Sequence, residues 1–166
     1  MGPLIGIAHH TSIARGTYSS EWGTPPEIVE VVRTAFGCID YDLASSEEHN
    51  RIVKAGIYFT KKDPLKNVNN LAPGMIYCNP PGPSELVLHF WVQWQVCVSL
   101  CGWQGAFLLF NIDHWRMLPR PTFHTKALLL RRRLRFVGAK HQANFSSMLF
   151  FAGAKAPTGW GHVVDF

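Results

Sequence analysis

The order of helical and strand-like patterns predicts an α/β fold in which helices flank a mixed, mostly parallel sheet. An amphipathic helical pattern ends at Gly37, and "CIDYDLASS" follows at once with alternating apolar and acidic residues. The buried strand-like runs "MIYC" and "GAFLLFN" then stand on either side of a long apolar helical pattern at about 85–101. This alternation of helices and strands indicates a doubly wound or mixed sheet.

Composition is consistent with a single folded domain. The chain has 166 residues, of which 47% are hydrophobic and only 16% are charged, so it can bury a sizeable core. Residues 1–20 are expected to form a flexible arm ahead of one domain at 21–166. The net charge of +5 is compatible with a nucleic-acid partner, although a charge of this size is common.

The first helix has signals at both of its ends. Thr24 is a suitable N-cap, Pro25 suits the first helical position, and Glu27 completes a capping box. Gly37 is expected to end the helix. Five apolar residues share one face between these ends: Ile28, Val31, Val32, Ala35 and Phe36.

The later segments are assigned in the same way. "SSEEHNRIVKAGIYF" has a helical pattern with Ser45 or Ser46 as its cap, and Ser84 can cap the helix at 85–101. The polar "TKKDPLKNVNNLAPG" predicts a surface loop, and "DHWRMLPRPTFH" predicts irregular structure. "KALLLRRRLRFVGAK" and "FSSMLFFAG" predict a strand pair, whereas the tail "APTGWGHVVDF" is left unassigned.

Neither a metal site nor a membrane span is expected. The four cysteines form no Cys-x-x-Cys pair and the histidines form no His-Glu-x-x-His motif, so buried reduced thiols are the better interpretation. No secretory signal is recognised at the start, and the most apolar stretch carries Glu85, His89 and two glutamines. We therefore expect a cytoplasmic protein with no membrane partner.

Two strand-like segments end in polar residues, where α/β sheets bind their ligands. "MIYC" leads into "NPPG" (79–82), for which a simple turn is one explanation. The other explanation is chemical. The Asn79 oxygen and the Pro80 carbonyl, held in place by two prolines, can accept hydrogen bonds from an exocyclic amine and direct its lone pair at an electrophile. The methyl sulfonium of S-adenosylmethionine is such an electrophile.

The segment after the first strand suits that methyl donor. Asp40 and Asp42 can hold its ribose or amino group, and the small residues Ala44 and Ser45 allow a close approach. Capping or solvated aspartates are the alternative for both acids. Trp22 can cover the adenine of the donor, or it can simply pack.

Four blocks of sequence resemble the phage-type, Dam-like DNA N6-adenine methyltransferases. They occur in this order: "EWGTPPEIVEVVRTAFGCIDYDLASSEEHN", "AGIYFTKKDPL", "MIYCNPPG", and "LLLRRRLRFVGA" followed by "FSSMLFFAG". The resemblance runs from Trp22 to Gly153. It implies a Rossmann-like class I methyltransferase fold, S-adenosylmethionine as donor, and adenine N6 in DNA as acceptor, in a bacterial host or phage-infected cell.

The resemblance also implies roles for single residues. A segment ahead of the first strand corresponds to a donor-binding motif: Thr24, Pro25 and Pro26. The acidic strand end lines the same pocket: Asp40, Asp42, Ala44 and Ser45. A catalytic tetrapeptide follows the next buried strand: Asn79, Pro80, Pro81 and Gly82.

The fourth position of that tetrapeptide departs from the family. It usually carries an aromatic that stacks on the extruded base, and Gly82 cannot do so. Another ring could substitute, such as Phe90, Trp91 or Trp115, and the sequence does not select among them. Without one, the target is bound differently, turnover is slow, or catalysis is lost.

Basic residues indicate where DNA would lie. In the strand-like "LLLRRRLRF", alternation places Arg131, Arg133 and Arg135 on one face, where they can follow phosphates. Lys61 and Lys62 in the polar loop can add to that surface. A solvated strand edge and solvating loop lysines are the alternatives. Because no target-recognition domain is visible, we expect relaxed or very short sequence recognition, or dependence on a second subunit, as in a homodimer.

Three functions are open at this point. The leading one is an S-adenosylmethionine-dependent DNA adenine N6-methyltransferase. The same chemistry on cytosine N4 or on RNA adenine is not distinguished by Asn-Pro-Pro. A catalytically degenerate methyltransferase fold that only binds DNA or a protein partner is favoured by Gly82.

Overall fold

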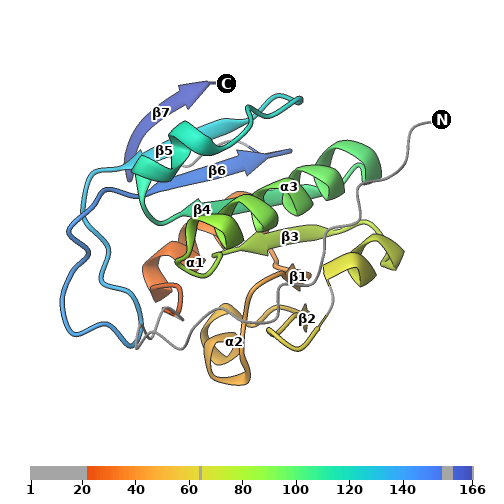
Figure 1. Ribbon diagram of the computed structural model, residues 1–166, viewed down its shortest axis with the longest axis horizontal. Helices are drawn as coiled ribbons and strands as arrows, with labels where there is room; N and C mark the ends of the chain where they lie inside the picture. The colour runs from red at the N-terminus through yellow and green to blue at the C-terminus, as the bar shows by residue number, and fades with distance from the viewer. Residues whose placement is uncertain (1–21, 64, 155–158, 166) are drawn as a thin grey trace.

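The computed structural model describes residues 22–63, 65–154 and 159–165, so the arm predicted at 1–20 lies outside the described residues. The described strands form one seven-stranded sheet in the order β2-β1-β3-β4-β6-β5-β7 (Figure 1). The elements are α1 (Pro26–Phe36), β1 (Tyr41–Asp42), α2 (Glu47–Val53), β2 (Ile57–Tyr58), η1 (Leu65–Asn70), β3 (Met75–Cys78), α3 (Ser84–Cys101), β4 (Gln104–Leu109), η2 (Ile112–Met117), β5 (Lys126–Leu130), β6 (Met148–Ala152) and β7 (Gly161–Asp165).

The sheet is mixed and mostly parallel, as the sequence predicts. β1 pairs in parallel with β2 and β3, and β3 pairs in parallel with β4. β6 runs antiparallel between β4 and β5, and β7 runs antiparallel to β5 at the edge. The predicted late strand pair is therefore confirmed as β5 and β6. This arrangement is compatible with a Rossmann-like fold.

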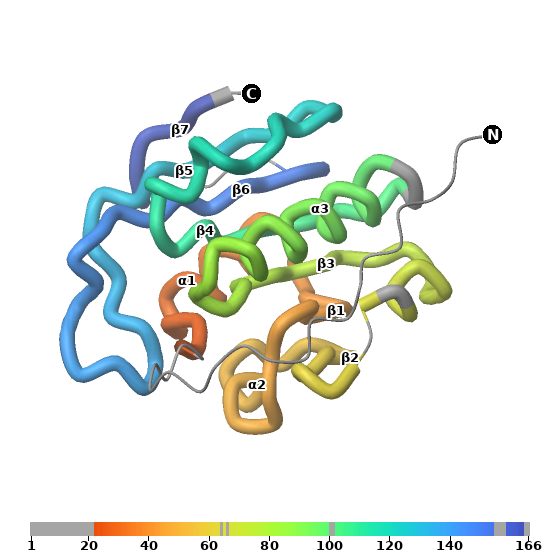
Figure 2. Tube along the Cα trace, in the orientation of Figure 1, coloured from red at the N-terminus to blue at the C-terminus, as the bar shows by residue number. Residues whose placement is uncertain are grey.

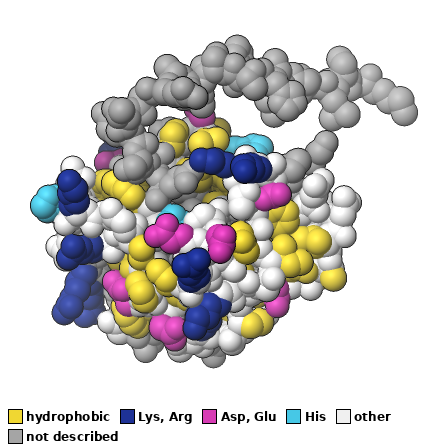
Figure 3. Space-filling model, turned by 90° about the horizontal axis from the view of Figure 1, so that it is seen from below, with side chains coloured by type: hydrophobic (Ala, Val, Ile, Leu, Met, Phe, Trp, Pro, Cys, Tyr) yellow, Lys and Arg dark blue, Asp and Glu magenta, His cyan; other side chains and the backbone are white. Residues whose placement is uncertain are grey.

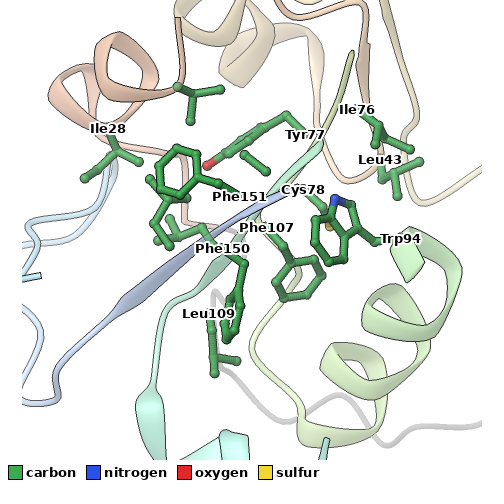
Figure 4. Close-up of a cluster of buried hydrophobic side chains, with 14 of the residues drawn as sticks. Ile28, Leu43, Ile76, Tyr77, Cys78, Trp94, Phe107, Leu109, Phe150 and Phe151 are labelled. Carbon is green, nitrogen blue, oxygen red and sulfur yellow. The ribbon is translucent and has the colours of Figure 1, made fainter. Parts of the chain in front are cut away.

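Helices cover both faces of the sheet. Phe151 in β6 stacks on Phe36 of α1 at 6.1 Å, whereas its neighbour Phe150 packs edge-on against Trp91 of α3 at 4.9 Å. Because successive side chains in a strand point to opposite faces, α1 and α3 lie on opposite sides. Figure 4 shows Phe151 on the side of Ile28, and Phe150 on the other side. α2 contacts α1 and adds to its layer.

Aromatic side chains fill the layer between α3 and the sheet. Trp91 and Trp94 are fully buried, stack on each other at 5.3 Å and contact Phe107 of β4. Gly105 allows this close approach, because a Cβ there would lie 2.5 Å from Trp94 Nε1. These rings stabilise the core.

The helix caps differ from the prediction at two places. α1 begins at Pro26 with Pro25 as its N-cap residue and no side-chain cap, so the capping box of Thr24 and Glu27 does not form. α3 begins at Ser84 itself, after Pro83, again without a side-chain cap. α2 has the predicted serine cap, because Ser46 Oγ accepts a hydrogen bond from the His49 N–H at 3.1 Å.

Several strand predictions also need correction. α2 ends at Val53, Lys54 takes a left-handed conformation with φ of 50°, and the segment predicted as its continuation forms β2. β5 ends at Leu130, so the arginines at 131–135 lie in a connection and not in a strand. The unassigned tail supplies β7. Within the described part of the chain, no helix has both the length and the apolar character that a membrane crossing requires.

Candidate functional site

A crevice opens where the chain leaves β1 and β3. After β1 the chain runs through α2 to β2 at one edge of the sheet, and after β3 it runs through α3 to β4 on the other side. Neighbouring parallel strands whose connections diverge in this way form the usual ligand-binding point of an open α/β sheet. Asp42 is paired with Tyr77, so the segments that follow the two strands leave the sheet side by side.

A cavity of about 380 Å³ lies at this point. Its walls come from the segments after β1, β2 and β3, from the start of α3 and from Trp22. The lining residues are Trp22, Leu43, Ala44, Ser45, Ser46, His49, Thr60, Lys61, Asp63, Leu65, Asn79, Pro80, Pro81, Leu86, His89 and Phe90. Three predicted donor-site residues, Trp22, Ala44 and Ser45, thus share one cavity with three of the four predicted catalytic residues. Gly82 is half-buried and does not line it.

The orientation of Asn79 is set by the chain ahead of α1. Asn79 Nδ2 donates a hydrogen bond to the Trp22 carbonyl at 3.0 Å. Asn79 Oδ1 accepts no hydrogen bond from the described residues. Because the amide nitrogen is engaged, the oxygen of this cavity-lining side chain remains as its hydrogen-bond acceptor.

Trp22 itself is held by two further contacts. Its ring stacks on Phe136 at 5.7 Å, and Gly23 forms an antiparallel bridge with Val137. Gly23 also packs on His49, since a Cβ there would lie 2.8 Å from the imidazole. The segment that orients Asn79 is therefore fixed to α2 and to the β5–β6 connection.

The predicted donor-binding motif at 24–26 lies outside the cavity lining. Thr24 is buried, and its hydroxyl shares a hydrogen bond of 2.9 Å with the Tyr77 hydroxyl. Burial raises the pKa of Tyr77 well above its usual value, so Tyr77 remains a neutral partner. Neither Thr24 nor the prolines line the cavity, and α1 begins at Pro26. This motif joins α1 to β3 next to Asn79.

Asp42 lies directly before the wall of the cavity. It is 2% exposed, and its Oδ1 accepts a hydrogen bond from the Ala44 N–H at 3.1 Å. Burial raises the pKa of Asp42 to about 7, although the Ala44 N–H and the Ser45 hydroxyl oppose this shift. Ser45 Oγ is buried and makes no hydrogen bond of normal geometry among the described residues. Asp42 thus shapes the turn at 43–45 and does not line the cavity.

Asp40 lies at the opposite end of the sheet from the cavity. Its Oδ2 accepts a hydrogen bond at 2.7 Å from the N–H of Met75, the first residue of β3. Asp40 therefore does not line the cavity that it was predicted to share with Ala44 and Ser45. The reason is the shortness of β1, which starts one residue after Asp40.

Asp63 is the cavity carboxylate that the sequence reasoning missed. Its Oδ2 accepts hydrogen bonds from the N–H and the hydroxyl of Thr60, both at 2.8 Å. These bonds lower the pKa of Asp63, so it is ionised at neutral pH. A Thr followed three residues later by Asp, directly after a strand, was the signal available in the sequence.

One of the three candidate rings reaches the cavity. Phe90 lines it together with Leu86 and His89, which share its face of α3 at helical spacing. Trp91 is fully buried and donates from Nε1 to the Pro119 carbonyl at 2.8 Å. Trp115 packs against Trp91 and Phe150.

The predicted basic residues divide between two places. Lys61 lines the cavity, and Lys62 is exposed beside it. Arg131, Arg133 and Arg135 are exposed in the β5–β6 connection, where strand alternation does not apply. Figure 3 shows lysine and arginine side chains gathered at the edge of the molecule where this connection lies in Figure 1. Elsewhere on that face, acidic and basic side chains are interspersed.

Among the described residues, no three His, Cys, Asp or Glu side chains are grouped so that they could hold a metal ion. Comparison of the chain with protein-family models, with curated proteins and with solved structures finds no match.

Proposed function

We propose that the chain is an S-adenosylmethionine-dependent DNA methyltransferase that transfers a methyl group to adenine N6. The observation that carries this proposal is the orientation of Asn79. Its amide nitrogen is engaged by the Trp22 carbonyl, while the residue lines a cavity at the carboxyl ends of β1 and β3. The side chain is thereby presented as a hydrogen-bond acceptor, which an exocyclic amine requires.

The cavity fits a donor of this kind. Its volume of about 380 Å³ lies within the range of roughly 300–1,000 Å³ that is usual for small-molecule sites. Trp22 and Leu43 supply apolar cover, Asp63 supplies a carboxylate, and the buried Ser45 Oγ lacks a hydrogen bond of normal geometry. These residues would hold the donor, which supplies an electrophilic methyl group when bound.

The residues after β3 act on the acceptor amine. Asn79 Oδ1 and the Pro80 carbonyl accept hydrogen bonds from the two N–H groups and orient the nitrogen lone pair. Positive charge develops on this nitrogen during transfer, so both hydrogen bonds strengthen at that stage. Pro80 and Pro81 restrict the backbone, so the carbonyl is in place beforehand.

Phe90 takes the place of the missing aromatic at position 82. It is the candidate ring that lines the cavity with Asn79 and the two prolines. An extruded base is stabilised by stacking on such a ring.

Methyl transfer from tritiated S-adenosylmethionine to unmethylated DNA tests the proposal. Asn79→Ala should reduce the rate about 100- to 1,000-fold, as loss of one charge-stabilising group typically does, and should retain donor binding. Asn70→Ala, at an exposed asparagine of η1, is the matched control and should be fully active. Full activity of Asn79→Ala would exclude Asn79 from catalysis. Mass spectrometry of the digested nucleosides separates N6-methyladenine from N4-methylcytosine.

A second candidate function is favoured by Gly82, because the two prolines are not followed by a ring. In that case the chain binds DNA or a protein partner and transfers nothing. Wild-type protein would then bind DNA in a salt-dependent manner, and S-adenosylmethionine would leave its melting temperature unchanged.

A further inference from the structure

A second cavity of about 360 Å³ adjoins the first and shares Trp22 with it. Its remaining walls come from Phe136 and from residues 138–145, all within the connection between β5 and β6. Trp22 is 37% exposed and lines both cavities. Nothing in the methyl-transfer chemistry requires this second cavity.

The connection that forms this cavity is ordered by specific contacts. The Ala143 N–H donates to the Leu134 carbonyl at 2.8 Å, which closes the loop on itself. Val137 and Gly23 exchange two backbone hydrogen bonds of 2.9 and 3.1 Å, which dock the loop onto the segment that orients Asn79. Figure 2 shows the connection extending past the end of the sheet toward the start of α1.

The charge of the chain is divided sharply along its length. Residues 114–164 contain nine Lys and Arg and no Asp or Glu, although the chain has 11 acidic residues in all. Five of these nine cations stand in the cavity-forming connection and are exposed: Arg131, Arg132, Arg133, Arg135 and Lys140. Such a segment attracts a polyanion.

The walls of the second cavity suit a nucleobase. The exposed Trp22 offers aromatic surface at its edge, and its ring is supported by stacking on the buried Phe136 at 5.7 Å. Gln142 and Asn144 are exposed at the rim, and each side-chain amide carries both a donor and an acceptor for the edge of a base. Ring surface beside a cationic segment is the combination that holds single-stranded nucleic acid.

We infer that the second cavity binds a base adjacent to the methylated one, while the arginines and Lys140 contact the flanking phosphates. This inference rests on the proposed function, because it takes the first cavity as the target site. Trp22 joins the two sites, since it lines both cavities and its carbonyl accepts a hydrogen bond from Asn79. The chain would thus read one neighbouring base without a separate recognition domain.

Fluorescence anisotropy with labelled oligonucleotides tests the inference without any donor. The probes are single strands and duplexes with one central adenine, varied at the two bases on either side. Wild type should prefer one neighbouring base by about 5- to 100-fold, the range expected for one amide-to-base contact. The double variant Gln142→Ala/Asn144→Ala should lose this preference and keep its affinity for the weaker probes, and unchanged circular dichroism confirms its fold.

Variants of the exposed cations provide a second test of the inference. Arg135→Ala and Lys140→Ala should weaken binding to all probes equally and should each reduce the slope of log affinity against log salt by about one. Arg120→Ala removes an exposed cation from the same acid-free segment outside the connection, so it should leave the slope nearly unchanged.

Two results would overturn the inference: wild-type binding that ignores the neighbouring base, or a preference that survives Gln142→Ala/Asn144→Ala. A failure of the proposed function can be distinguished from a failure of this inference. If the neighbouring base is read through Gln142 and Asn144 but no methyl group is transferred, the second cavity stands and the catalytic assignment falls.

Discussion

The buried Asp42 carboxyl should make the stability of this protein decrease as pH rises toward neutrality. Its pKa is about 7 in the folded chain, against 3.8 as the ordinary value, because burial disfavours the charged form. Well below pH 4 the carboxyl is protonated in both states and contributes no pH dependence. Between pH 4 and 7 the folded state keeps a proton that the unfolded state releases, so the free energy of unfolding falls.

The size of this effect follows from the shift. About three pKa units at 1.36 kcal/mol each give roughly 4 kcal/mol between pH 4 and pH 7. A loss of this size is a large part of the stability of a small domain. Asp42→Asn removes the titration and retains an oxygen acceptor for the Ala44 N–H. Any cost of placing the extra amide hydrogens is independent of pH.

Urea denaturation of wild type and Asp42→Asn at pH 4, 5, 6, 7 and 8, at constant ionic strength, measures the effect. The stability of the variant relative to wild type should rise by about 4 kcal/mol from pH 4 to pH 7 and then level off. Asp63→Asn is the control of opposite sign. The pKa of Asp63 is lowered, so its contribution is present above pH 4 and is lost as pH falls. Parallel curves for wild type and Asp42→Asn would refute the argument.

Three further predictions concern single contacts. Thr24→Val should destabilise the fold by about 1–3 kcal/mol, because it leaves the buried Tyr77 hydroxyl unpaired. In chemical denaturation, Thr24→Val/Tyr77→Phe should cost less stability than the sum of the two single changes. Gly105→Ala should reduce stability by about 1–3 kcal/mol, because its Cβ clashes with the Trp94 ring. Thermal melts should show that Gly105→Ala/Trp94→Phe recovers part of this stability, since the smaller ring leaves room for the Cβ. Phe90→Ala should raise the KM for DNA about 5- to 150-fold, from a stacking loss of about 1–3 kcal/mol, while leaving donor binding unchanged. Phe90→Tyr keeps an aromatic ring and should retain activity. Val92→Ala, at an exposed position of α3, should not change the kinetics.

Much of the sheet could be predicted because its signals are local. "MIYC" is β3 residue for residue, since a fully buried strand reads as one short apolar run between turn residues. β2 was missed because two residues are too few to show any period, and its pairing with β1 is a tertiary contact. The arginines at 131–135 extended an apparent strand beyond Leu130, but β5 ends there and these arginines are exposed in the connection that follows.

The cavity lies at the strand ends where the sequence placed the candidate site, but it is not lined by every residue predicted there. The carboxyl ends of β1 and β3 follow from the parallel order, and this places Ala44 and Ser45 beside Asn79. Asp40 and Asp42 are separated by one residue in the sequence, yet one contacts the start of β3 and the other is buried ahead of the cavity wall. Residue type alone does not distinguish these positions, because the exact start of a two-residue strand decides them.

The orientation of Asn79 could not be predicted from the neighbouring sequence, because its hydrogen-bond partner is the Trp22 carbonyl, 57 residues away. This contact depends on the Gly23 bridge to Val137, which in turn depends on the β5–β6 connection folding back through Leu134 and Ala143. The acceptor in the first cavity is therefore positioned by the loop that forms the second. A strand of DNA that contacts this loop would therefore bind next to the segment that holds Asn79, so recognition of a neighbouring base and orientation of the target amine would depend on the same segment of chain.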